Sequence, residues 1–330
     1  MRTVWKPRVW TRTVWAVAVA ALALMTAVPA EAQTYPTKPI KMIVPFGPGT
    51  ITDSLTRIFS QELSLALGQP VVVVNKGGAD GSIGATEAAR SPPDGYTLLV
   101  APNSSIAVVP LLRKAPPYDP LADFTSISFM GDTTFLIVVN PALAVTSIAE
   151  LVAYAKANPG KVNYATANTT GIVSTALLAT NNGVDMNHIP YKSEPEAIPD
   201  RLSGQVQLMI ASYATVGQHV KAGKLRALST ALTVRTPLLP DVPSILEAGQ
   251  SKFPIGPWGA LLGPAKLPPE IVARLNKETV AILAKPEVKD AMQKLGFAAR
   301  SSTPEEFTAY LKDQLTIWKK ALIDAKIEPQ

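Results

Sequence analysis

The chain has 330 residues, no cysteine, two histidines and a formal net charge of +6. Without cysteine it cannot be a disulfide-stapled small domain, use a cysteine nucleophile or carry a lipid on a cysteine, and a zinc site would be short of ligands. The mild positive balance suits small acidic ligands but is too weak to predict nucleic-acid binding. We therefore expect no metal, no cofactor and no nucleic-acid partner.

The first 32 residues have the pattern of a secretory signal peptide. Four basic residues precede an apolar run over 13–28, and Ala30-Glu31-Ala32 supplies the small-x-small cleavage pattern. A transmembrane anchor is the alternative, but the apolar run is short for a bilayer span. We expect cleavage after Ala32 and export to the periplasm without a lipid anchor. Loss of the four basic residues and Glu31 lowers the formal charge from +6 to +3.

Strands and helices alternate over the first third of the mature chain. Strands are predicted at Ile40–Val44, Val71–Asn75 and Thr97–Ala101, with helices between them over Leu55–Leu67 and Gly81–Ala89. The strands are nearly continuous in apolar residues, which is typical of strands covered on both faces. This alternation predicts βαβ units and a largely parallel sheet.

A second set of elements follows a long β-rich run, Phe124–Asn140, which Gly131-Asp132 interrupts. Ser147 and Glu150 form a capping-box pattern that begins a helix ending near Asn158. Further strands are predicted at Val162–Ala165, Met186–Pro190, Val206–Ile210 and Leu225–Thr230, and a helix at Ser174–Asn181. The chain ends in helices that begin near Lys266, Pro286 and Thr303.

The usual catalytic signatures are missing from this sequence. It has no nucleophile elbow, no zinc-protease motif and no phosphate-binding Walker loop. A Ser-His-Asp hydrolase stays open as an alternative because such triads are geometric rather than sequential. Gly78–Gly84 resembles a dinucleotide fingerprint only loosely, and we interpret it as a glycine turn that lets a helix pack close to the sheet. The protein is expected not to be an enzyme, and no catalytic residue is predicted.

Four short polar loops follow predicted strands, each before a predicted helix. Ligands bind at the carboxyl ends of strands in open parallel sheets, where helix N-termini offer N–H groups to an anion. The predicted ligand-binding residues are Phe46, Gly49, Thr50 and Thr52 in the first loop, Asn103, Ser104 and Ser105 in the second, Asn168, Thr169 and Thr170 in the third, and Ser212 and Tyr213 in the fourth. Asp53 is expected to cap the helix rather than to contact an anionic ligand.

The order of several motifs over the mature chain resembles a known family, the extracytoplasmic solute receptors of tripartite tricarboxylate transporters, or Bug family. The motifs run from "VPFGPGTITD" (Val44–Asp53), "GGADGSIGA" (Gly77–Ala85) and "PPDGYTLL" (Pro92–Leu99) to "GVDMNHIPYK" (Gly183–Lys192), "GQVQLM" (Gly204–Met209), "AGKLRAL" (Ala222–Leu228), "RTPLLPDVPSILEAG" (Arg235–Gly249), "IVARLN" (Ile271–Asn276) and "TPEEF" (Thr303–Phe307).

The resemblance implies an α/β protein with the type II periplasmic-binding-protein fold. Two α/β lobes, joined by two crossing strands near Phe135–Asn140 and Leu225–Thr230, would close on a ligand in the cleft between them. Lobe 1 is expected at 33–136 and 229–330, and lobe 2 at 137–228. The implied function is capture of a di- or tricarboxylate or an aromatic carboxylate by a monomer. Delivery to a membrane permease with one large and one small subunit is also implied; a ligand sensor with a signalling partner is the alternative.

Two positions depart from the family pattern. Thr50 stands where the family usually has a glycine, which predicts a hydroxyl at the cleft that could distinguish this ligand. Ala211 stands where many members have an aspartate that suits ligands with an amino group. The resemblance therefore favours a plain carboxylate over an amino acid.

Overall fold

The structure is a computed structural model that describes Met1, residues 35–251, Phe253 and residues 256–329. Lys38–Gln330 forms one compact unit, distinct from residues 1–37, and contains all the helices and strands described below. The predicted signal peptide, apart from Met1, lies outside the described residues. Among those described, no helix is both long and apolar enough to cross a bilayer.

A six-stranded sheet forms one half of the compact unit. Its order is β11-β4-β10-β3-β1-β2. β1 pairs in parallel with β2 and β3, whereas β10 is antiparallel to both β3 and β4, and β11 is antiparallel to β4. The strands are β1 (Ile40–Val44), β2 (Val71–Asn75), β3 (Thr97–Pro102), β4 (Phe124–Thr133), β10 (Trp258–Pro264) and β11 (Phe297–Ala299).

A five-stranded sheet forms the other half, in the order β7-β6-β8-β5-β9. β6 is parallel to β7 and β8, and β5 runs antiparallel to both β8 and β9. The strands are β5 (Phe135–Val139), β6 (Asn163–Thr166), β7 (Asn187–Pro190), β8 (Leu208–Ser212) and β9 (Arg226–Thr230). Both sheets are therefore mixed, which corrects the prediction of a largely parallel sheet.

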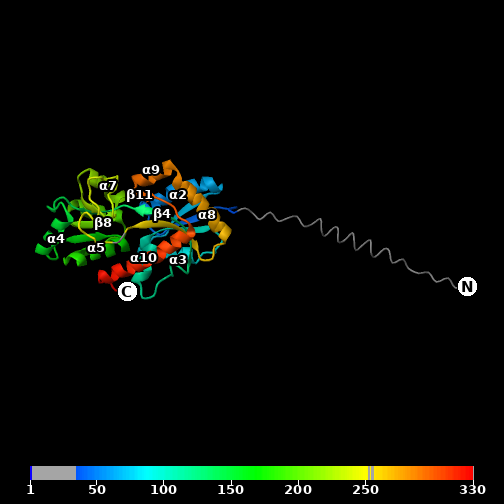
Figure 1. Ribbon diagram of the computed structural model, residues 1–330, viewed down its shortest axis with the longest axis horizontal. Coiled ribbons are helices and arrows are strands. Elements are labelled where there is room, and N and C mark those ends of the chain that lie inside the picture. Colours follow the sequence, from blue (N-terminus) through cyan, green and yellow to red (C-terminus); the bar gives the residue numbers. More distant parts are fainter. Residues whose placement is uncertain (2–34, 252, 254–255, 330) are drawn as a thin grey trace. The chain divides into compact units, whose positions relative to one another are not determined.

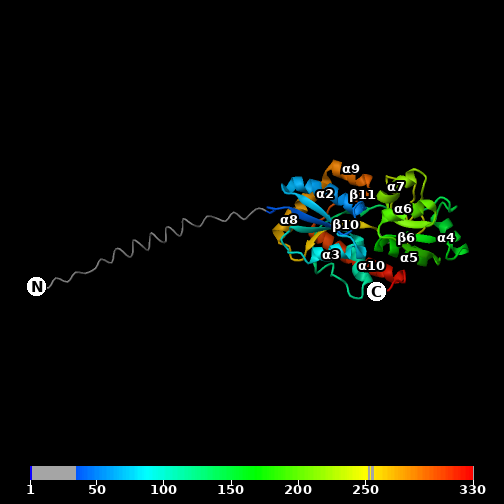
Figure 2. The same ribbon diagram turned by 180° about the vertical axis from the view of Figure 1, so that it is seen from behind.

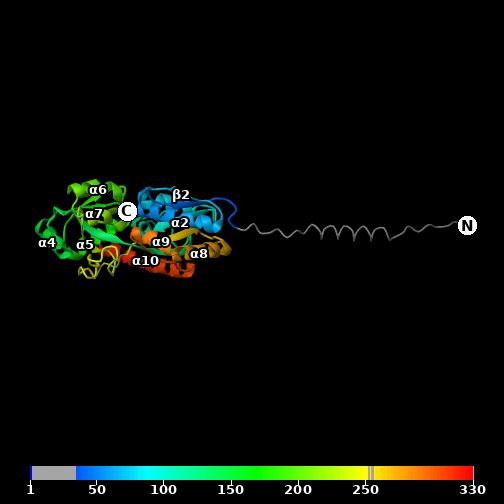
Figure 3. The same cartoon turned by 90° about the horizontal axis from the view of Figure 1, so that it is seen from above.

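Helices cover the two sheets as separate groups (Figures 1 and 2). In the six-stranded half, α2 and α9 lie on one side of the sheet and α3 and α10 on the other. In the five-stranded half α4, α5, α6 and α7 gather at one end of the unit (Figure 3). The helices are α2 (Ile51–Leu67), α3 (Ser82–Ala89), α4 (Ile148–Ala157), α5 (Thr169–Asn182), α6 (Glu194–Ser203), α7 (Tyr213–Lys221), α8 (Pro269–Ala284), α9 (Pro286–Lys294) and α10 (Pro304–Asp324), with short turns η1 (Ala79–Gly81), η2 (Ser104–Val108) and η3 (Val109–Leu112).

The chain passes between the two sheets at two places. The long β-rich run breaks at Thr134, between β4 and β5, and not at Gly131-Asp132 as predicted, because those two residues pair with β10 and β11 inside the sheet. The return runs from the end of β9 at Thr230 to the start of β10 at Trp258. Helix α10 also contacts elements of both halves, namely β4 and α5. The predicted lobe boundaries stay a prediction.

The glycine turn before α3 has the packing role expected of it. A Cβ on Gly84 would lie 2.8 Å from the carbonyl oxygen of Lys76 and 3.0 Å from Cα of Pro45. Both contacts are with backbone, which cannot move aside cheaply. Gly84 therefore lets α3 lie close to the ends of β1 and β2, next to the turn that opens α2.

Two predicted element boundaries near the site were wrong. Helix α5 begins at Thr169 instead of Ser174, and β8 runs to Ser212, so its predicted loop is the end of a strand. Elements β10, β11 and α6 were not predicted. Ser147 caps α4 as expected, but Glu150 accepts hydrogen bonds from Thr146, one residue before the position that a capping box requires.

Candidate ligand-binding site

A cavity of about 70 Å³ lies where the two sheets meet. One water molecule needs a cavity volume of about 10–15 Å³, so this cavity suits several waters or a small compact ligand. The lining residues come from both halves: Phe46, Thr50, Ile51, Thr52, Leu55, Val100, Ala101, Pro102, Asn103, Ser104, Met130, Thr133, Pro257, Trp258, Gly259 and Phe297 from the six-stranded half, and Phe135, Ala167, Asn168, Thr170, Ser193, Glu194, Pro195 and Thr215 from the five-stranded half.

The N-terminus of α2 forms one wall of the cavity. Thr50 is its N-cap residue: its hydroxyl donates to the carbonyl of Gly47 (2.9 Å) and accepts from the N–H of Asp53 (3.4 Å). Ile51 and Thr52 both line the cavity, and their backbone N–H groups have no acceptor within the described part of the chain. Such orphan N–H groups at a helix start favour an anion. The Thr50 hydroxyl, by contrast, is used by the cap.

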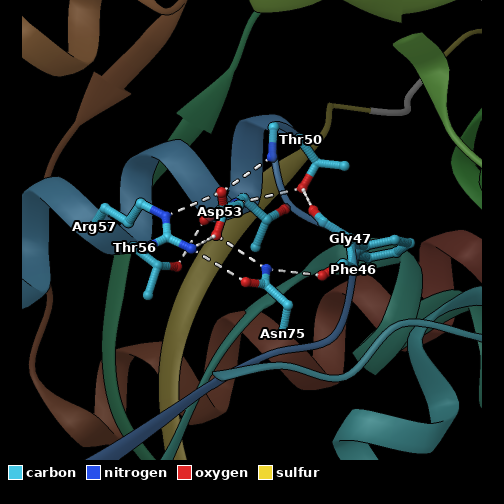
Figure 4. A network of polar contacts seen from close by, with 9 residues as sticks. Phe46, Gly47, Thr50, Asp53, Thr56, Arg57 and Asn75 are labelled. Atoms are coloured by element: carbon cyan, nitrogen blue, oxygen red, sulfur yellow. Dashed lines mark hydrogen bonds and ion pairs between the residues drawn. The ribbon is translucent and has the colours of Figure 1, made fainter. Parts of the chain in front are cut away.

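Asp53 holds this turn from behind (Figure 4). Its carboxylate accepts from the N–H of Gly49 (3.0 Å), from Asn75 Nδ2 (2.9 Å) and from Arg57 Nε (3.1 Å). Burial alone would raise the pKa of Asp53, but the hydrogen bonds from Arg57, Asn75 and Gly49 and the charge of Arg57 outweigh it and leave the pKa below its ordinary value of 3.8. The ionised carboxylate braces the turn before α2, whose N-cap residue is Thr50, and does not line the cavity. The helix-capping role expected of Asp53 stays a prediction.

Two hydrogen bonds connect the two halves of the protein beside the cavity. Asn103, which follows β3, donates from Nδ2 to Thr170 Oγ1 on α5 (3.0 Å), and its Oδ1 accepts from the N–H of Trp258 (3.4 Å). The Thr169 hydroxyl donates to the carbonyl of Ser104 (3.3 Å). Trp258 itself is fully buried, with Nε1 donating to Gln314 on α10. These contacts connect the C-terminal end of β3 to the first residue of β10 and to the start of α5.

The N-terminus of α5 forms the opposite wall. Asn168 is its N-cap residue, and its Oδ1 accepts from the N–H of Gly171 (2.9 Å). The backbone N–H groups of Thr169 and Thr170 have no acceptor among the described residues. The first turns of two helices therefore line the same small space, Ile51 and Thr52 from α2 and Thr170 from α5, which favours a bound anion.

Glu194 is the first residue of α6 and lines the cavity, although the sequence did not mark it as a site residue. Its Oε2 accepts from the N–H (3.1 Å) and hydroxyl (2.6 Å) of Ser212 and from the hydroxyl of Thr215 (2.9 Å). Its Oε1 accepts only from Asn168 Nδ2, at 3.3 Å. Burial raises the pKa of Glu194, and the hydrogen bonds from Ser212, Thr215 and Asn168 oppose that rise.

The structure brings most of the predicted binding residues together. Seven of the twelve line the cavity: Phe46, Thr50, Thr52, Asn103, Ser104, Asn168 and Thr170. The other five lie behind it. The N–H of Gly49 donates to the Asp53 carboxylate, and the Ser105 hydroxyl donates to the carbonyl of Pro102. The hydroxyl of Thr169 donates to the carbonyl of Ser104, and that of Ser212 donates to Glu194. Tyr213 is buried, and its N–H donates to the carbonyl of Thr134. Direct ligand contact by any of them stays a prediction.

Several of the residues that sequence reasoning missed lie in elements that it did not predict. Trp258, Gly259 and Phe297 belong to the unpredicted strands β10 and β11, and Glu194 and Pro195 to the unpredicted helix α6. The only available signal was the Ser193-Glu194-Pro195 start of α6, which has an acid and a proline in its first turn. No histidine lines the cavity, and no cluster of metal-ligating side chains was found among the described residues.

The two mixed sheets and the cavity at their junction define the class as a periplasmic-type solute-binding protein. The protein resembles solved structures of that class over most of its length. The periplasmic binding protein BugD is 34% identical with a TM-score of 0.83, and 90% of this chain covers all of that one. The Rpa4515 protein of R. palustris with adipate is 30% identical with a TM-score of 0.85 over the same shares.

A family model for the tripartite tricarboxylate transporter family receptor, TctC, matches residues 55–327. Protein BugT of Bordetella pertussis is 37% identical over 296 residues, which cover 88% of this chain and 90% of that protein. The chain therefore belongs to the tripartite tricarboxylate transporter receptor family, as the sequence motifs predicted. Members of this family are binding receptors of transporters and not enzymes.

Proposed function

We propose that the protein captures a small organic carboxylate in the cavity between its two sheets and delivers it to a membrane permease with one large and one small subunit. The observation that carries the proposal is that residues from the starts of two helices line one cavity. Three backbone N–H groups of these lining residues, Ile51, Thr52 and Thr170, have no acceptor within the described chain. A carboxylate is the ligand group that such donors hold best.

The remainder of the cavity wall supports a ligand with an apolar body. Phe46, Leu55, Val100, Met130 and Phe135 are among the side chains that line it. Apolar walls with a few directed polar groups are typical of small-molecule sites. The related Rpa4515 protein is described with adipate, an aliphatic acid, which fits the same pattern.

We further propose that the two halves are lobes that close on the ligand, with lobe 1 at 33–136 and 229–330 and lobe 2 at 137–228. The single-residue break at Thr134 and the return after Thr230 would serve as the hinge. Closure would remove the ligand from water and strengthen each N–H···carboxylate bond. In the cell this would take place in the periplasm, after cleavage of the signal peptide.

A thermal-shift screen tests the proposed function. Each acid of a panel of aliphatic and aromatic carboxylates is paired with its own primary amide, which has nearly the same shape but no charge. An acid that binds should stabilise the fold by about 2.7 kcal/mol at a hundredfold excess over Kd, and its amide should not. The proposal would be contradicted if no acid of the panel raises Tm, or if each amide raises Tm as much as its acid does.

A further inference from the structure

Glu194 is the only ionisable side chain among the residues that line the cavity, within the part of the chain that the structure describes. No lysine, arginine or histidine lines it. A receptor for anions thus has a carboxyl group in its wall and no side-chain cation to balance a ligand's charge. The feature therefore bears directly on which acids can enter.

The two oxygens of the Glu194 carboxyl group differ in the number of hydrogen bonds that they accept. Oε2 receives three hydrogen bonds, from Ser212 and Thr215, whereas Oε1 receives a single long one from Asn168. A carboxylate can accept about four hydrogen bonds in all, two at each oxygen. Oε1 therefore has an acceptor position to offer to a donor on the ligand.

The carboxyl group also occupies a helix N-terminus that could otherwise serve a ligand. Ser212 is the N-cap residue of α7 and Thr215 lies in its first turn. By bonding to both, Glu194 places its own carboxyl group at the start of that helix, where an anion is favoured. Apart from the start of α6, to which Glu194 itself belongs, the N-termini of α2 and α5 are then left for a carboxylate of the ligand.

From these observations we propose that Glu194 determines specificity: the cavity accepts a ligand with one carboxylate and a cationic, hydrogen-bond-donating group at its far end, and rejects dicarboxylates. This inference rests on the proposed function. The ligand carboxylate lies at the starts of α2 and α5, and the donor group lies at Glu194 Oε1. The single carboxylate predicted here differs from the dicarboxylate adipate of the Rpa4515 structure. It also replaces the expectation of a plain carboxylate drawn from Ala211, because Glu194 supplies a carboxyl group in the cavity wall that the sequence did not mark.

A series of matched ligands tests the inference on the wild-type protein. Each set keeps the same chain and changes one end from methyl to ammonium to carboxylate: butyrate, β-alanine and succinate; pentanoate, γ-aminobutyrate and glutarate; hexanoate, δ-aminovalerate and adipate. Calorimetry should show, in the set whose length fits, the ammonium ligand binding most tightly. The dicarboxylate should bind about a hundredfold or more weaker, because two like charges in a buried site repel.

Glu194→Gln removes the charge and keeps the shape of the side chain. In this variant the dicarboxylate should gain affinity by about tenfold or more relative to wild type, and the ammonium ligand should lose its advantage over the methyl ligand. Asp185→Asn is the control: it removes a charge from an exposed residue of the same half, outside the cavity, and should leave the order of affinities unchanged.

The outcomes separate the inference from the proposed function. If the wild-type protein binds the dicarboxylate as tightly as the ammonium ligand, the inference is overturned while carboxylate binding stands. The inference is also overturned, while carboxylate binding stands, if Glu194→Gln folds, binds acids and shows the same order of ligand affinities as wild type. If no acid of the series or of the wider panel binds the wild-type protein, the proposed function falls and the inference with it.

Discussion

Individual side chains in this site act mostly by holding backbone in place. Thr50 and Asn168 cap the helices whose free N–H groups form the two walls, and Asp53 braces the turn before α2. Sequence reasoning could find these residues because caps have a short, local signature. It could not find Glu194, whose role depends on Ser212 and Thr215, residues that lie 18 and 21 positions further along the chain.

The Asp53 carboxylate gives a test at this scale. Because its folded-state pKa is below 3.8, its contribution to stability is fully present above that pH and is lost as the pH falls through the folded value. We expect Asp53→Asn to lower the free energy of unfolding by about 1–2 kcal/mol at neutral pH. The difference from wild type should shrink below pH 3.8, as measured by denaturant unfolding across pH.

The control for Asp53 is Asp324→Asn, which removes a half-exposed carboxylate whose only ion pair among the described residues is with the exposed Lys320 (2.7 Å). Exposed pairs of this kind contribute little. The difference in free energy of unfolding between Asp53→Asn and wild type could instead stay constant from neutral to acid pH. That result would show that the carboxylate does not act in its ionised form.

At the scale of secondary structure, the sequence predicted the strands and helices with strong periodicity and missed those that depend on tertiary contacts. β10 contains two glycines and ends in a proline, so it resembles a loop, yet it fits between β3 and β4 and pairs with both. α6 contains Pro195 and Pro199, which argued against a helix. The start of α5 is rich in Thr and Gly, residues that are common in loops, so its sequence predicts a loop there although Asn168 caps the helix.

Helix α2 allows one N–H group to be deleted without breaking the helix. Ile51 is the first helical residue, where proline is well tolerated, and Thr50 before it is already extended (φ −74°, ψ 161°). Compared with Ile51→Ala, which shortens the same side chain but keeps the N–H, Ile51→Pro should weaken carboxylate binding by about 1.5–3 kcal/mol. Its free energy of unfolding should stay within about 1 kcal/mol of the alanine variant's, by calorimetry and denaturant unfolding. Equal affinities in the two variants would show that this N–H does not hold the ligand.

For the whole molecule, the order of family motifs predicted the α/β fold with two sheets, and the structure and its relatives confirm it. The sequence could not predict how the sheets meet. The cavity depends on the Asn103–Thr170 bond, on the break at Thr134 and on a strand inserted from residues 258–264, and these positions are far apart in sequence. A site made from several distant segments has no local signature, which is why its polar loops were predictable and its apolar wall was not.

The central claim is that the space between the two sheets holds an organic acid. The most direct measurement is native mass spectrometry of the protein purified from the periplasm, followed by identification of any small molecule released on unfolding. We predict a bound acid with one carboxylate and one ammonium group. A released ligand that has no carboxylate would contradict the claim, as would bare protein that also fails to bind any acid of the panel.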